Sequence, residues 1–133
     1  MGSLSLQETI AANLADVRHR LARAIERAGR SPSSVRLVAI SKTHPADAVR
    51  AAHAAGQTRF GENRVQEALE KIEATSDTPI EWHLVGHLQS NKARKAAGAF
   101  ACIHSIDGAD LLRRVDDAAA EGGHTPELFV QVD

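Results

Sequence analysis

Short apolar runs and helical stretches alternate along most of this chain, with only a few residues between them. This alternation restricts the fold more than any other feature, because each new parallel strand needs a helical crossover to bring the chain back. The pattern predicts an α/β fold, with a leading helix and then β-α-β-α-β-α-β-α-β in one parallel sheet. The expected strands cover residues 35–40, 58–61, 80–85, 101–104 and 128–132.

The leading helix shows a beginning, an apolar face and an end. Ser5 and Glu8 form a capping-box pattern, in which each side chain satisfies a free backbone donor near the other. Gly29 and Pro32 are typical of a helix end. Apolar residues recur at spacings of three and four, which predicts one helix face made of Ile10, Leu14, Val17, Leu21 and Ile25.

Four more helices are expected between the strands. On the one that follows residues 58–61, Glu67 and Lys71 are spaced i,i+4, so an ion pair is expected there. The residues expected to begin or end these helices are Pro45 and Gly56, a cap within residues 63–66, Lys92 and Gly98, and Asp107 with Gly122-Gly123.

Composition excludes several classes of function. The chain has 133 residues and a formal net charge of −1, which suits one globular domain and argues against bulk attraction to nucleic acid or a membrane surface. With three Phe, one Trp and no Tyr, stacking on single-stranded bases is not expected. The single cysteine, Cys102, cannot form an internal disulfide, and no apolar run reaches membrane-spanning length. These features predict a cytoplasmic protein.

Lys42 stands directly after the first expected strand, where parallel α/β folds place their ligands. One interpretation is a surface cation that reaches from the strand end into solvent. The other is a Schiff-base lysine, partly desolvated so that its neutral amine attacks an aldehyde. The residues alone leave both open. Polar and glycine residues follow the other strands too, at 61–63, 86–87, 104–107 and 131–133.

Histidines near the strand ends raise the question of a metal site. His83 and His87 are four residues apart, which on a strand is too far for them to converge easily on one ion. No HExxH or Cys/His framework is present. We therefore expect hydrogen-bonding histidines and no metal, and we expect Cys102 to be a small buried apolar residue.

The basic run at residues 90–95 has two interpretations. Free backbone amides at a helix start there could hold an anion, or the run is a solvated helix face, which we favour. Other nucleotide and hydrolase motifs are absent. Ser41-Lys42-Thr43 follows the first strand in place of GxGxxG, and neither GxxxxGK[ST] nor GxSxG occurs.

Four segments carry a specific resemblance to a known family. They are LVAISKT (37–43), FGENRVQEA (60–68), EWHLVGHLQSNK (81–92) and IHSID (103–107). In this order they resemble the YggS/PROSC family, the pyridoxal 5′-phosphate homeostasis proteins, over nearly the whole chain. One departure is Arg64, where many members of that family have Tyr.

The resemblance implies a TIM-type barrel like the N-terminal domain of alanine racemase, with pyridoxal 5′-phosphate as its cofactor. It implies that Lys42 holds the cofactor as an internal aldimine, that Asn63 lies beside the ring, and that His83 is a further pocket residue. Members of the family are regarded as carriers of the cofactor without known amino-acid turnover. The expected function is therefore cofactor binding in vitamin B6 homeostasis.

A complete barrel contains eight βα units in roughly 250 residues, and this chain reaches the fifth strand. We therefore expect residues 1–133 to form a partial, truncated barrel domain without the later loops in which the family grips the phosphate. Open strand edges invite pairing with another chain, so self-association is expected. Two alternatives remain: a half-barrel that associates without binding the cofactor, and a racemase-like or decarboxylase-like domain of the same fold type.

Overall fold

The computed structural model describes residues 4–133. The expected alternation of strands and helices is confirmed. The elements in chain order are α1 (Leu6–Arg27), the 3-10 helix η1 (Pro32–Ser34), β1 (Ala39–Ile40), α2 (Ala46–Ala54), β2 (Arg59–Glu62), α3 (Val65–Ala74), β3 (Glu81–Leu84), the 3-10 helix η2 (Ser90–Lys92), α4 (Ala93–Ala99), β4 (Cys102–Ile106), α5 (Ala109–Gly122) and β5 (Glu127–Val130).

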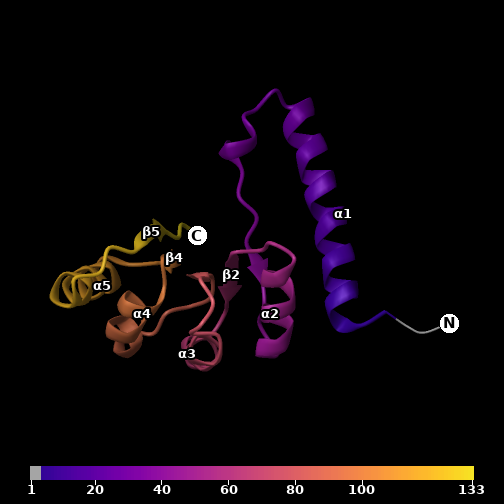
Figure 1. Cartoon of the computed structure of the whole chain (residues 1–133). Helices are drawn as coiled ribbons and strands as arrows, with labels where there is room; N and C mark the ends of the chain where they lie inside the picture. The colour runs from indigo at the N-terminus through magenta and orange to yellow at the C-terminus, as the bar shows by residue number, and fades with distance from the viewer. Residues whose placement is uncertain (1–3) are drawn as a thin grey trace.

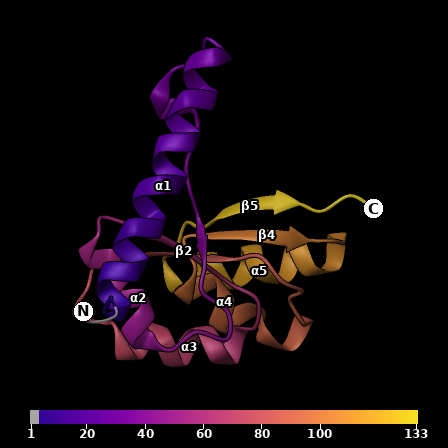
Figure 2. The same ribbon diagram turned by 90° about the vertical axis from the view of Figure 1, so that its right-hand side faces the viewer.

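The strands form one parallel sheet in the order β1-β2-β3-β4-β5. A doubly wound sheet reverses its strand order and carries helices on both faces, whereas a barrel adds every strand on the same side of the last. Here the order never reverses, and α2, α3, α4 and α5 lie along one face of the sheet (Figures 1 and 2). The predicted barrel-type α/β fold is therefore confirmed, as an open sheet of five strands with a covered face and an uncovered face.

The hydrophobic core lies between the covered face and the helices. Phe60, Trp82 and Leu84 point into it from β2 and β3 and are at most 5% exposed. Each large apolar side chain buried in this way contributes about 1.5–3 kcal/mol. The helices supply mostly small partners, which allows them to approach the sheet closely: Ala52, Ala68, Ala93, Ala96, Ala97 and Ala119.

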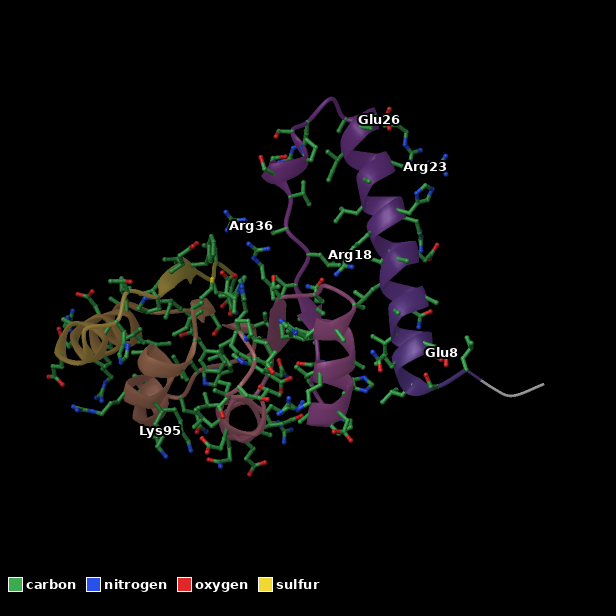
Figure 3. The ribbon with its side chains drawn as sticks, viewed as in Figure 1. Glu8, Arg18, Arg23, Glu26, Arg36 and Lys95 are labelled. Atoms are coloured by element: carbon green, nitrogen blue, oxygen red, sulfur yellow. The ribbon has the colours of Figure 1, made fainter. Side chains whose placement is uncertain are left out.

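Helix α1 packs along α2 with one half and extends beyond the sheet with the other (Figure 1). Ser5 caps it by accepting a hydrogen bond from the Glu8 backbone N–H, at 3.1 Å, as expected. Arg18 ties it to the turn after α2, with its guanidinium donating to the Ala55 carbonyl at 2.7 Å and to Gln57 Oε1 at 3.2 Å (Figure 3). Beyond Arg18, a cavity of about 510 Å³ separates α1 from η1, lined in part by Leu21 and Ile25. The predicted apolar face thus meets the core only near Ile10 and Leu14.

Several element boundaries differ from the sequence-based expectations. The strand expected at 35–40 is reduced to Ala39–Ile40 and is not fully buried. β1 lies at the edge of the sheet, and two of its residues, Ala39 and Ile40, pair with β2. The N-cap of α3, Arg64, lies within the expected residues 63–66 but makes no side-chain cap hydrogen bond. For α5 the N-cap is Gly108 and not the expected Asp107. Asp107 instead places its Oδ2 atom 3.7 Å from His87 Nδ1.

Within residues 4–133, no helix combines the length and the apolar character needed to cross a membrane.

Candidate functional site

The carboxyl ends of β1 and β2 bring Lys42 and Asn63 to the same edge of the sheet. Ile40 pairs with Gly61 across the two strands, and each of the two site residues follows its strand residue by two positions. Both side chains are exposed. Ligands of parallel barrels bind at this edge, so the structure places two of the three predicted site residues together where a ligand would lie.

Lys42 sits in a tight turn with unusual backbone geometry. The His44 backbone N–H donates to the Ser41 carbonyl at 3.0 Å, and Thr43 has φ of +67°. A β-branched residue rarely adopts this left-handed conformation, which costs on the order of 1–3 kcal/mol and persists only where the surroundings hold it. The turn must therefore be anchored by contacts on either side of Lys42.

A buried ion-pair network supplies those anchors from the covered face of the sheet; we call Ser41, Glu62, Glu67 and Lys71 the anchor network. Lys71 Nζ donates to the Ser41 carbonyl at 2.6 Å and contacts Glu62 at 3.1 Å and Glu67 at 3.0 Å. The Ser41 hydroxyl donates to the Glu62 carboxylate. The Thr43 backbone N–H donates to Glu67 Oε1 at 2.6 Å. The residues before and after Lys42 are thus both held.

Burial makes this network rigid. The Glu62 side chain is 0% exposed and that of Lys71 is 8% exposed, so each charge depends on the other and on its hydrogen bonds for solvation. The hydrogen bond from the Thr43 N–H, followed by the contact with Lys71, holds the pKa of Glu67 below its usual value. The predicted pair between Glu67 and Lys71 is confirmed, with Lys71 buried and the Glu67 side chain 31% exposed.

Asn63 is positioned by its contact with Gly86, the residue that follows Val85 after β3. A side chain at Gly86 would collide with both the backbone oxygen and the side-chain oxygen of Asn63. The glycine is therefore required by close approach between two loops. A cavity of about 350 Å³ opens beside this contact, lined by Asn63, Arg64, Val65, Gln66, His87, Gln89 and Lys92.

His83 lies deeper in the sheet, in the row that pairs with Gly61. It is buried, and both of its ring nitrogens have partners: Nδ1 lies 2.9 Å from His104 Nε2, and Nε2 lies 2.8 Å from Glu81 Oε2. Arg59 completes the chain, with Nε 3.0 Å from the same Glu81 oxygen. The third predicted site residue therefore belongs to a polar chain on the uncovered face, one row below Lys42 and Asn63.

The environment of this polar chain shifts its titratable groups. The hydrogen bond with His83, and then the charge of Arg59, hold the pKa of Glu81 below its usual value. Burial, reinforced by His83, lowers the pKa of His104. Burial also raises the pKa of the Cys102 thiol to about 11. Cys102 is buried, as expected, and its ligand-type sulfur lies close to both histidines.

His87, unlike His83, is exposed, and it faces Asp107. In the basic run at residues 90–95, Arg94 pairs with Glu121 at 3.1 Å and Lys95 extends into solvent (Figure 3). Sequence reasoning predicted only one part of the anchor network, the Glu67–Lys71 pair, and missed the contacts that Lys71 and Ser41 make with Glu62. A signal for the missed part was Glu62 itself, an acidic residue directly after the expected strand.

Comparison with known proteins agrees with this geometry. The family model described as "Alanine racemase, N-terminal domain" matches residues 12–133. A curated relative, "Pyridoxal phosphate homeostasis protein" of Pseudomonas aeruginosa, is 47% identical over 124 residues, which are 93% of this chain and 54% of the relative. The protein of the same description from Escherichia coli K12 is 47% identical over 111 residues, 81% of this chain and 47% of the relative.

Two solved structures of PipY from Synechococcus elongatus PCC7942, one without and one with PLP bound, superpose with a TM-score of 0.81 at 49% sequence identity. The match covers 93% of this chain and 54% of PipY. This chain thus spans about half the length of the relatives it matches.

Proposed function

From the premise that this chain belongs to the alanine racemase N-terminal domain family, we propose that it binds pyridoxal 5′-phosphate and acts as a carrier of that cofactor in its homeostasis. The observation that carries the proposal is the setting of Lys42: an exposed amine at a strand end, on a backbone turn that is held from both sides. A PLP-bound relative of 49% identity supports the choice of ligand.

In this proposal, Lys42 holds the cofactor covalently. Its neutral amine adds to the aldehyde carbon, the C=N bond forms, and the carbonyl oxygen leaves as water. The anchor network fixes the backbone on either side, so the amine reaches the ligand without reorganisation of the turn. Asn63, held by Gly86, is assigned to the edge of the ring.

The residues present fit the aldehyde end of the cofactor better than its phosphate end. An exposed lysine amine at the strand-end edge suits an aldehyde. Through Asp133 the sequence contains no glycine-rich phosphate loop, so we assign no phosphate ligand within this chain.

We propose a carrier without turnover because acid–base catalysis needs a positioned proton donor or acceptor beside the reacting atoms. His83 does not meet that need, since both of its ring nitrogens are already hydrogen-bonded, to His104 and to Glu81. The cofactor-loaded chain is expected not to racemise L-alanine. Conversion to D-alanine, followed by chiral chromatography, would instead support the racemase-like alternative.

The proposal is tested by incubation with pyridoxal 5′-phosphate, reduction with borohydride and peptide mass mapping. The reduced adduct is expected on Lys42 and absent from the Lys42→Ala variant. Lys95→Ala serves as a control, because Lys95 is an exposed lysine on α4 and does not follow a strand end (Figure 3). Labelling spread over surface lysines and unchanged by Lys42→Ala would overturn the proposal.

A second candidate is self-association of the open sheet. The side chains of Ile40, Phe129 and Val130 are 48%, 51% and 67% exposed, and they lie on the two edge strands. Unpaired strand edges with exposed apolar residues favour pairing with another copy. Sedimentation over a range of concentrations tests this, and a monomer at every concentration would rule it out.

A further inference from the structure

Three residues on the uncovered face form a cluster that the proposed function does not use: His83, Cys102 and His104, here called the His–Cys–His cluster. One ligand-type atom from each residue lies within 4.8 Å of the other two. Four ligand atoms in a tetrahedral zinc site, each about 2.0–2.3 Å from the ion, stand roughly 3.3–3.8 Å apart. The cluster thus needs only small side-chain rotations to surround one metal ion.

The fold itself brings these residues together. His83 pairs directly with Cys102 across β3 and β4, and His104 follows Cys102 by two residues, which returns it to the same face of the strand. The spacing that argued against a metal in the sequence, between His83 and His87, does not apply to this set. Cross-strand pairing supplies the convergence that a single strand could not.

The surroundings of His83 match those of a metal-binding histidine. Metal-bound histidines usually donate their second ring N–H to a carboxylate, which fixes the tautomer and strengthens the ligand. Glu81 Oε2 lies 2.8 Å from His83 Nε2 and is itself held by Arg59. The proton therefore belongs on Nε2, and the Nδ1 lone pair faces His104 Nε2 at 2.9 Å.

The donor set selects the kind of metal. A thiolate and two imidazoles suit zinc and its spectroscopic substitute cobalt, whereas magnesium and calcium prefer oxygen ligands. Three protein ligands leave a fourth position for water or another small ligand. On binding, the Cys102 thiol gives up its proton to solvent, and His104 coordinates through Nε2 once its proton has moved to Nδ1.

His83 and Cys102 in the cluster are buried, and His104 is partly exposed. Cys102 and His83 are 3% and 8% exposed, and Phe129 on β5 stacks on the His104 ring with centroids 5.3 Å apart. No helix from α2 to α5 covers this face of the sheet (Figure 2). From the ligand geometry, the carboxylate partner and the open face together, we propose that His83, Cys102 and His104 form a site for one zinc ion.

Titration of the cofactor-free chain with Co²⁺ under reducing conditions tests the site. We expect a thiolate-to-cobalt charge-transfer band that saturates at one ion per chain, together with the intense visible bands of tetrahedral cobalt, and displacement of both by Zn²⁺. Because Cys102 is the only cysteine in the sequence, the charge-transfer band has one possible source. Absence of that band at a saturating cobalt concentration would overturn the proposal.

Variants separate coordination from folding. Cys102→Ser is expected to abolish the band, His104→Gln to weaken Zn²⁺ binding at least tenfold, and Glu81→Gln, which alters the partner of a ligand, to weaken it about tenfold. His87→Gln is the matched control, because His87 is an exposed histidine outside the cluster, and it should bind as the parent does. Equal affinity in His104→Gln and the parent would contradict the assignment.

A measurement on the unmodified chain keeps the test valid if a variant fails to fold. Bound Zn²⁺ should slow alkylation of Cys102 at least tenfold, and a chelator should restore the original rate. Unchanged alkylation at saturating Zn²⁺ would exclude a thiolate ligand. Neither readout involves pyridoxal phosphate, so the zinc site and the carrier proposal stand or fall separately.

Discussion

The two faces of the sheet handle charge in different ways. On the covered face, Glu62 and Lys71 are enclosed between the sheet and α3, with side chains 0% and 8% exposed. On the uncovered face, Arg59 and Glu81 form a similar pair, but their side chains are 32% and 40% exposed. Water can replace a lost partner on the uncovered face and not on the covered one, so equivalent substitutions should differ strongly in cost.

The largest effect is expected from Lys71→Met. It leaves the Glu62 carboxylate buried without a cation, which typically costs about 3–5 kcal/mol in unfolding free energy. Denaturant unfolding measures this, with Lys95→Met on the exposed side of α4 as a control expected within about 0.5 kcal/mol of the parent.

The double variant Glu62→Gln/Lys71→Met sharpens the test. Removal of both charges should recover much of the loss, since a neutral amide needs no counter-ion and still accepts from the Ser41 hydroxyl. If the single and double variants were equally unstable, packing of the lysine stem and not the buried charge would be the cause.

Two glycine substitutions should have the next largest cost in stability. Gly86→Ala places a methyl group against the backbone of Asn63, which cannot move without shifting the loop, and should cost about 1–3 kcal/mol. Gly61→Ala is the matched change on the uncovered face, where the new methyl group meets the flexible end of the Ile40 side chain 2.6 Å away.

We expect Gly61→Ala to be the milder of the two by thermal unfolding, because Ile40 is half exposed and can rotate aside. Gly86→Ala should also reduce borohydride-trapped labelling at Lys42, since it displaces Asn63 from the same edge. A Gly61→Ala variant as unstable as Gly86→Ala would mean that the uncovered face is packed as tightly as the loop contact.

Arg59→Met should have a smaller effect, of about 1 kcal/mol or less. Its ion pair with Glu81 is partly exposed, and such pairs contribute little once solvent screening is included. The comparison with Lys71→Met in the same denaturant gives the contrast between the two faces directly. A cost for Arg59→Met equal to that of Lys71→Met would contradict it.

The smallest effect concerns pH. The pKa of Glu67 is lower in the folded chain than in the unfolded one, because the Thr43 N–H and Lys71 favour the ionised carboxylate. That contribution to stability is present above the unfolded pKa and is lost as the pH falls through the folded pKa. Glu67→Gln should therefore flatten the acid side of a stability–pH curve, whereas Glu70→Gln, an exposed neighbour on α3, should leave it unchanged.

Sequence reasoning located the edge of the sheet but not the face of each residue. It placed Lys42 and Asn63 after consecutive strands, and parallel pairing brings such residues together. It ended the second strand at Gly61, whereas β2 continues to Glu62. This one residue decides whether the anchor network is foreseen. Side chains alternate along a strand, so Glu62, two residues after Phe60, points to the same covered face.

The His–Cys–His cluster on the uncovered face was also not predictable from local sequence patterns. His83 and His104 are 21 residues apart in sequence, and their contact depends on which residue of β3 faces which residue of β4. A shift of that register by one position would turn Cys102 and His104 to the covered face. The alternating hydrophobic pattern of each strand restricts this register, but the row that meets His83 is fixed only when β3, β4 and the α4 crossover pack together.

By itself, the sequence determined the alternation of elements, the parallel sheet and the position of Lys42 at a strand end. Each of these follows from spacing within a few residues, which local hydrophobic periodicity and turn residues record. The tertiary structure alone decided that Lys71 is an interior cation beneath Lys42, and that His83 meets Cys102 and His104. Those contacts join separate elements, and their geometry comes from strand register and helix packing, which only the assembled core fixes.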